Sequence, residues 1–166
     1  ANLRSCIFEI NEALGAGTLR SDQDRISLSR ESLRLDVDEF RALAAPCGRH
    51  STEESCPLCA GRLEAAPRAW RAGFMAGFTL PDSSDFDEWQ FRWGCRLKAE
   101  YSSALRRLSS MLRAEGRLAE AEDCAQRWIA AEPFEEEARC LEIRLLLEEG
   151  ERAMALECYE AWAKTA

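Results

Sequence analysis

Histidine is almost absent from this sequence, and basic side chains are fewer than acidic ones. The 166 residues include 22 lysines and arginines against 30 aspartates and glutamates, so the net charge is -8. A domain that binds nucleic-acid phosphates by itself usually carries a basic face, so DNA is not the obvious partner of this chain alone. No apolar run approaches the roughly 18 residues of a membrane-spanning helix, and the N-terminal residues are amphipathic rather than a signal sequence. We therefore expect a soluble, cytoplasmic protein without membrane contact.

The motifs of common catalytic sites are also missing. His50 is the only histidine, and a Ser-His-Asp or Cys-His arrangement needs a histidine as its base. The sequence has neither the G-x-x-x-x-G-K-[ST] loop nor a G-x-G-x-x-G turn after a strand, the two motifs that hold nucleotide phosphates. With 46% apolar residues the chain can bury a core, so we expect one globular domain or two small ones, without enzymatic activity.

A dense group of metal-ligand residues is present in CGRHSTEESCPLC, with the pattern C-x2-H-x5-C-x2-C. Cys47 and His50 form one closely spaced pair, Cys56 and Cys59 form the other, and two such pairs suit the tetrahedral ligand shell of Zn²⁺. Four protein ligands leave no position for water, so the pattern predicts a structural zinc site. Two alternatives stay open: a redox pair at Cys56 and Cys59, and a polar loop with incidental cysteines.

The other five cysteines are scattered through helical patterns: Cys6, Cys95, Cys124, Cys140 and Cys158. A reduced cysteine in such a pattern behaves as a small buried apolar residue. A disulfide framework of a secreted protein is the alternative. We favour reduced cysteines, in agreement with a cytoplasmic location.

The N-terminal residues change from helical to strand periodicity. Apolar residues at helical spacing form one stripe: Leu3, Ile7, Ile10 and Leu14. This stripe predicts a helix with one buried face that ends at Gly15. The alternation in RISLSRESLRLD predicts a β-hairpin with strands at residues 26–28 and 33–35 around an SRES turn. From Asp36 onward helical patterns dominate, including a helix that starts near Ser84 and runs to about Ala114.

The last third of the chain contains an internal repeat. Aligning GRLAEAEDCAQRWIA, from Gly116, with GERAMALECYEAWAK, from Gly150, gives a period of 34 residues and superposes Trp128 on Trp162. This is the period of tetratricopeptide repeats, in which small residues let paired helices approach closely. We therefore expect tetratricopeptide-like hairpins over about residues 100–166, with both tryptophans packed against neighbouring helices. A generic pair of helical hairpins is the alternative.

The order of these segments resembles a known family. LRLDVDEFRAL, AWRAGFMAGFTLPDSSDFDEWQ and the repeats together resemble the bacterial transcriptional activator domain of AfsR-like and SARP-type regulators, where it follows an OmpR-type winged helix. The resemblance implies a mainly α fold, with tetratricopeptide-like helical hairpins preceded by a helix and β-hairpin remnant of a winged helix. In this view residues 1–36 are the C-terminal part of a winged-helix DNA-binding domain. Residues 37–166 are the helical activator domain, with the zinc loop at 47–59.

Residues that contact DNA would come from the start of the first helix and from the wing: Asn2, Arg4, Arg25 and Arg30. Glu9 and Glu12 lie opposite the apolar stripe, where acidic side chains repel phosphates. The chain also begins with the recognition-like helix, although a winged helix needs earlier helices to hold that element in the groove. We therefore expect a fragment that does not bind duplex DNA specifically by itself.

The resemblance implies a non-catalytic module of a bacterial transcriptional regulator. The helical repeats would serve self-association and contact to the transcription machinery, and DNA would be bound only through the complete regulator. The alternative function is a tetratricopeptide-like adaptor between proteins that has no link to DNA.

Overall fold

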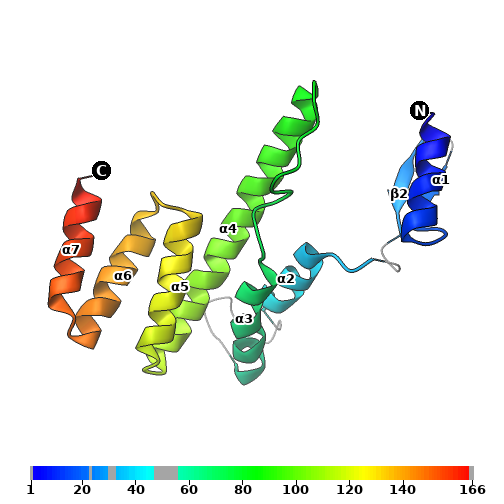
Figure 1. The fold of residues 1–166 in the computed structure, drawn as a ribbon. Helices are drawn as coiled ribbons and strands as arrows, with labels where there is room; N and C mark the ends of the chain where they lie inside the picture. The colour runs from blue at the N-terminus through cyan, green and yellow to red at the C-terminus, as the bar shows by residue number, and fades with distance from the viewer. Residues whose placement is uncertain (1, 23, 30–32, 47–55, 165–166) are drawn as a thin grey trace. The chain divides into compact units, whose positions relative to one another are not determined.

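The computed structural model describes residues 2–22, 24–29, 33–46 and 56–164 (Figure 1). The chain divides into two compact units, Ala1–Glu39 and Phe40–Ala166. The predicted fold class is confirmed, because helices dominate the described residues and one antiparallel β-hairpin follows the first helix. In the described part of the chain no helix is long and apolar enough to cross a membrane.

Unit 1 consists of helix α1 (Leu3–Leu14) and strands β1 (Leu19–Ser21) and β2 (Ile26–Leu28). The strands pair antiparallel with Leu19 opposite Leu28, and the turn is closed by the Asp22 N–H, which donates to the Arg25 carbonyl at 2.8 Å. The predicted strand at 26–28 is therefore confirmed, but its predicted partner at 33–35 is wrong. The polar stretch after β1 supplies the turn. Leu35 instead accepts a hydrogen bond from Glu39 N at 3.1 Å, as the residue before a helix does.

The predicted buried face of α1 is also wrong for the described residues. None of the residues of α1 is buried, and Leu3 and Leu14 on the apolar stripe are 64% and 58% exposed. Amphipathicity shows which face of a helix can be covered, whereas burial requires a partner element. The hairpin contacts α1 through β1 and leaves this stripe open.

The first half of unit 2 contains α3 (Pro57–Ala69), the long α4 (Ser84–Ala114) and, from Phe40 onward, the helix α2 (Asp36–Ala44). Pro57 occupies the first turn of α3, where its missing N–H costs no hydrogen bond. Phe40 of α2 is buried against Trp70 and Tyr101, whose rings stack with centroids 4.5 Å apart. This aromatic cluster joins α2, the end of α3 and the middle of α4.

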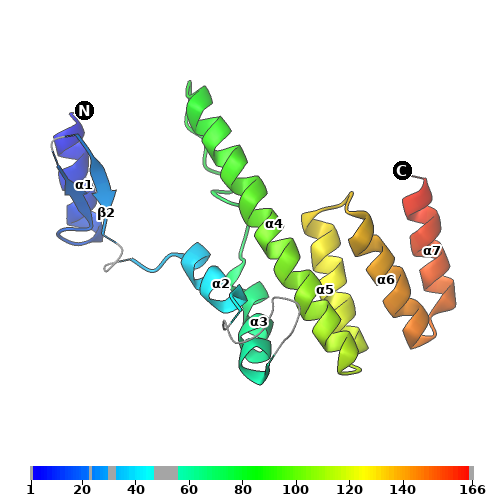
Figure 2. The ribbon, with the colours of Figure 1, turned by 180° about the vertical axis from the view of Figure 1, so that it is seen from behind.

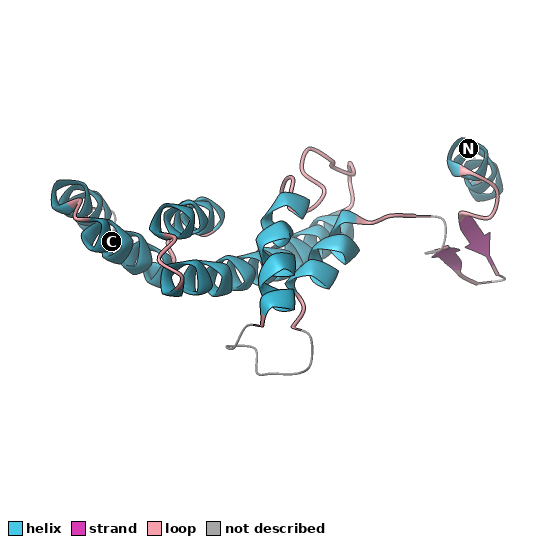
Figure 3. Cartoon of the chain, turned by 90° about the horizontal axis from the view of Figure 1, so that it is seen from below, coloured by secondary structure: helices cyan, strands magenta, loops and turns pink. Residues whose placement is uncertain are grey.

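The second half of unit 2 is a row of antiparallel helices: α4, α5 (Leu118–Ala131), α6 (Glu136–Glu149) and α7 (Arg152–Ala163). Each packs against the next, as Figures 2 and 3 show from behind and from below. Between α4 and α5, the buried Ser109 hydroxyl donates to the Ala121 carbonyl at 3.0 Å.

The predicted repeat is confirmed by the turns that close its two hairpins. Gly116 and Gly150 both have left-handed backbone, with φ of 76° and 89°. The residue after each glycine donates the same backbone hydrogen bond, from Arg117 N to Leu112 O at 2.9 Å and from Glu151 N to Leu146 O at 2.8 Å. This is the helix-ending geometry that favours glycine, repeated at the predicted period.

The two tryptophans of the repeat differ in burial. Trp128 is 4% exposed because α5 lies between α4 and α6, whereas Trp162 on α7 is only partly buried. The prediction that both rings are packed is therefore met fully by Trp128 and partly by Trp162.

Candidate functional site

The start of α1 holds two of the residues predicted to contact DNA. Asn2 is the N-cap of α1, and its Oδ1 accepts a hydrogen bond from the Arg4 backbone N–H at 2.8 Å. The Arg4 side chain is exposed. Asn2 therefore has a local structural role, which leaves Arg4 as the exposed cation at this end of the helix.

The hairpin is fixed to α1 by one amide side chain. Asn11 Nδ2 donates to the Leu19 carbonyl at 3.1 Å, and Asn11 Oδ1 accepts from Leu19 N at 2.7 Å. Thr18, which is 1% exposed, donates to the Gly15 carbonyl at 2.8 Å and so closes the turn between helix and strand. These bonds set the position of the hairpin relative to the helix.

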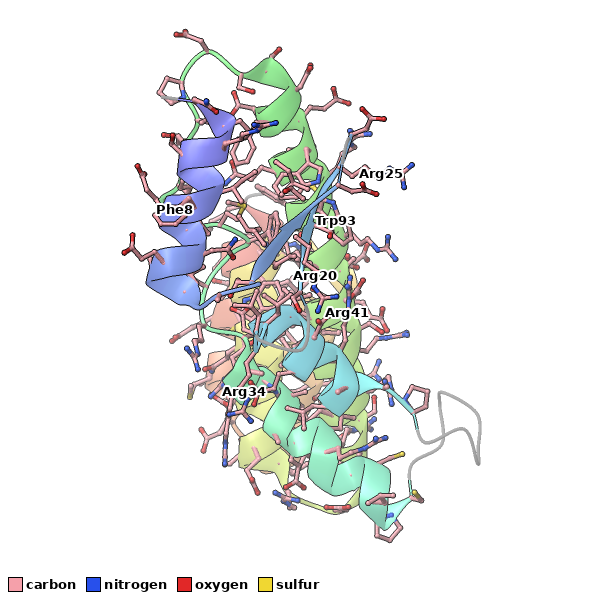
Figure 4. All side chains as sticks on the ribbon, turned by 90° about the vertical axis from the view of Figure 1, so that its right-hand side faces the viewer. Phe8, Arg20, Arg25, Arg34, Arg41 and Trp93 are labelled. Atoms are coloured by element: carbon pink, nitrogen blue, oxygen red, sulfur yellow. The ribbon has the colours of Figure 1, made fainter. Side chains whose placement is uncertain are left out.

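The hairpin displays arginines from both strands (Figure 4). Arg25 is exposed just before β2, and Arg20 is exposed on β1, opposite Ser27 in the register. Arg30 lies outside the described residues. Sequence reasoning missed Arg20 because it placed both strands after residue 25. Phe8, 68% exposed on α1, was also missed because it lies off the apolar stripe.

The described half of the predicted metal motif lies at the start of α3. Cys56 is the N-cap residue of α3, and Cys59, 2% exposed, lies in its first turn, so both thiols belong to the same end of one helix. The Arg62 Nη2 group lies 3.8 Å from Cys59 Sγ and donates to the Ala45 carbonyl at 2.6 Å. This guanidinium therefore ties the end of α2 to the cysteine turn.

Cys47 and His50 lie outside the described residues, so the four-ligand set stays a prediction. Among the residues that are described, no group of three or more His, Cys, Asp or Glu side chains forms a metal site. Cys56 and Cys59 lie three residues apart at the N-terminus of α3, so they could supply two of the four ligands of the predicted site.

A charged cluster lies where α2 meets α4. Arg41 makes a bidentate ion pair with Glu100, at 2.7 and 2.8 Å, and Arg96 approaches the same carboxylate at 3.3 Å. These hydrogen bonds hold the pKa of Glu100 below its ordinary value, and the bond from Arg41 has the largest effect. The Arg41 and Arg96 guanidinium carbons also lie 5.7 and 5.3 Å from the centre of the Trp93 ring. Figure 4 labels Arg41 and Trp93. The cluster fixes α2 on α4 through one carboxylate that two guanidinium groups share.

Comparison with known proteins identifies the family of the chain. A search of curated proteins and a search of solved structures each return no match. The family model of the bacterial transcriptional activator domain matches residues 35–165, which include α2, the long α4 and both repeat hairpins. Since this match covers most of the sequence, the chain belongs to the bacterial transcriptional activator domain family.

Proposed function

We propose that this chain is a non-catalytic, cytoplasmic module of a transcriptional regulator. In this proposal unit 2 serves self-association and protein contact, and unit 1 is the C-terminal part of a winged-helix DNA reader. The observation that carries the proposal is the family match, which starts at residue 35, directly after a helix and hairpin joined by Asn11. A recognition helix followed by a β wing has this order.

The open apolar stripe of α1 supports the winged-helix part of the proposal. A recognition helix uses one face for DNA and the opposite face for the helices that hold it. The stripe with Leu3 and Leu14 is exposed in unit 1, so it is available to such helices, while Arg4 and Phe8 lie away from it. The family match does not favour the alternative adaptor without a link to DNA.

The test compares the present chain with the longer protein that includes the residues encoded before Ala1. Fluorescence anisotropy at one moderate salt concentration would measure the binding of both to a labelled promoter repeat. We expect weak, salt-sensitive binding by the present chain and specific binding by the longer protein. In the longer protein, Arg25→Ala should weaken binding, whereas Arg92→Ala, an exposed change on α4, should not. Absence of specific binding by the longer protein would contradict the DNA-reader role.

Self-association is measured separately by sedimentation equilibrium of the same two proteins. A concentration-dependent rise in mass above that of one chain, 18.7 kDa for the present chain, is expected. If the mass stays at that of one chain over the accessible range of protein concentration, self-association is excluded. The role in contact with other proteins would remain.

We also propose a structural zinc ion bound by Cys47, His50, Cys56 and Cys59. The support is the ligand spacing together with the position of Cys56 and Cys59 at the N-terminus of α3. Bound zinc would stabilise the connection between α2 and α3. Elemental analysis should find one zinc per chain in the purified protein and in the exposed-cysteine control Cys95→Ser, but much less in Cys56→Ser. Equal zinc in both variants, or none in the parent, would exclude the site.

A further inference from the structure

Helix α4 extends well beyond the helix that packs beside it. It has 31 residues, against 14 in α5, so at 1.5 Å per residue it is about 25 Å longer. Figure 1 shows its N-terminal half projecting past the end of α5. A helix in the row α4 to α7 is normally covered along its length by the next helix, but this half of α4 has no such neighbour among the described residues.

The face of α4 that α5 covers continues into this projecting half. Two helical heptads before the buried Leu105 and Leu112, the same side of α4 carries Phe91 and Lys98. Phe91 is 71% exposed, whereas Leu105 and Leu112 are 0% and 2% exposed. The same helix face is thus a packed core surface at one end and an open apolar surface at the other.

This open surface forms a groove of about 380 Å³. One wall is Trp70 and Phe74, and the floor along α4 includes Phe91, Gly94 and Lys98. Apart from the backbone of its own helix and its chain neighbours, no atom lies within 4 Å of the place where a Gly94 Cβ would be, so the helix surface has a notch there. A second hollow, lined by Trp70, Lys98 and the last alanines of α5, continues the groove to the end of α5.

The walls of the groove are held in place by ring contacts. Trp70 stacks on Tyr101 at 4.5 Å, and Phe74 meets the edge of Trp89 at 5.3 Å. The Gln90 amide donates to the carbonyls of Met75 and Phe78 and fixes the loop that carries Phe74 on α4. A ligand would therefore enter a preformed site and would not have to order the loop.

We propose that this groove binds an amphipathic helix of a partner protein, antiparallel to α4 and continuing the line of α5. In that orientation the first turn of the partner helix lies near Lys98 and its last turn near Asp87, which line opposite ends of the groove. Lys98 Nζ also lies 3.9 Å from the Glu132 carboxylate, but the Lys98 side chain is 44% exposed and can still meet a carboxylate of a ligand. The partner helix therefore carries acidic residues in its first turn, near Lys98, and basic residues in its last turn, near Asp87. This pattern also suits the helix dipole.

A second copy of the chain fits the groove less well. The described helices with an acidic first turn and a basic last turn are α2 and α4. Both bury apolar residues in the core of unit 2, such as Phe40 and Leu105. A partner of different sequence is therefore favoured. The inference rests on the protein-contact role proposed above, but its test involves neither DNA nor self-association.

The probe is a fluorescein-labelled synthetic helix of about 14 residues, the length of α5, with leucine and alanine on one face. It carries glutamates in the first turn and arginines in the last turn, and its control is the peptide of reversed sequence. Anisotropy titration of the full chain should show saturable binding of the probe and binding of the control that is weaker by about tenfold or more. Absence of saturable binding, or equal binding of the two peptides, would overturn the proposal.

Three variants locate the probe. Gly94→Leu adds a side chain to the groove lining at a position with room for its Cβ and should abolish binding, as should Phe91→Ser, which changes an exposed ring. The matched control, Arg92→Leu, adds leucine to an exposed position of α4 outside the groove lining and should bind like the parent. Circular dichroism should show parental helix content in all three. If both groove variants bind the probe as well as the parent does, the groove is not its site.

Discussion

The burial difference between Trp128 and Trp162 gives a quantitative test of the repeat. Both rings occupy the same position of the repeat, but Trp128 is 4% exposed between helices on both sides and Trp162 is only partly buried on α7. Truncation of each ring to alanine therefore makes the same chemical change in two environments.

The cost of Trp128→Ala follows from the apolar area that the ring buries. A buried tryptophan removes roughly 200 Å² from water, which at about 25 cal/mol per Å² corresponds to about 5 kcal/mol. The indole Nε1 of Trp128 is buried without a hydrogen-bond partner, and removing it returns about 1 kcal/mol or more. We therefore expect a loss of about 3 to 4 kcal/mol for Trp128→Ala, and about half of that for Trp162→Ala.

Urea denaturation followed by circular dichroism measures both values at pH 7. Trp128→Phe is the matched control, because it keeps an aromatic ring and removes the unpartnered N–H, so it should cost about 1 kcal/mol. If Trp162→Ala costs as much as Trp128→Ala, then α7 is covered in solution by an element that the structure lacks. If neither substitution costs more than about 1 kcal/mol, the packing described for α5 is wrong.

The remaining predictions concern titration and backbone geometry. Burial raises the pKa of the Cys124 thiol from 9.0 to about 11, and the negative charge of Asp123 adds a smaller effect in the same direction. The folded state therefore binds the thiol proton more tightly than the unfolded state does. Stability should therefore fall between about pH 9 and pH 11 by on the order of 2 kcal/mol, and Cys124→Ala should reduce this fall in denaturation curves measured across that range. Glu100→Gln should cost about 1 kcal/mol at pH 7; because the pKa of Glu100 is lowered from 4.5, the difference from the parent should begin to shrink as the pH falls below about 4.5 and should vanish only in stronger acid, where the folded protein also binds the proton. Gly150→Ala should cost about 1 kcal/mol because of its φ of 89°, whereas Gly94→Ala, within α4, should stabilise by a similar amount.

The helices and the repeat could be predicted because their signals are local. The start of α4 follows a stretch rich in proline, glycine and serine, and its predicted span agrees with Ser84–Ala114. The period of 34 residues marks the turns at Gly116 and Gly150, where only left-handed backbone closes the hairpin. Such features depend on residues a few positions apart, which sequence patterns record directly.

The prediction for the hairpin of unit 1 is wrong because strand pairing, unlike helix formation, depends on contacts between residues that are not close in the sequence. The alternating pattern of residues 26–28 is compatible with pairing to residues 19–21 or to residues 33–35. Leu33 and Leu35 match this pattern as well as Leu19 does. The deciding contacts are the two hydrogen bonds between the Asn11 side chain and the Leu19 backbone, which no periodicity reveals. The error also hid Arg20, since its strand was not recognised.

In both units, the apolar face of a helix could be predicted from the sequence, but its burial could not. The stripe of α1 and the N-terminal half of α4 each have the pattern of a packed helix face, yet Leu3, Leu14 and Phe91 are exposed. A sequence pattern specifies a surface that favours burial, whereas the element that buries it belongs to another part of the chain or to another molecule. For α1 the proposed winged-helix function would give that role to other helices of the same DNA-binding domain. For α4 we assign the covering role to a helix of a partner protein. The open face carries Asp87 and Lys98 at opposite ends, and these opposite charges favour one orientation of the partner helix.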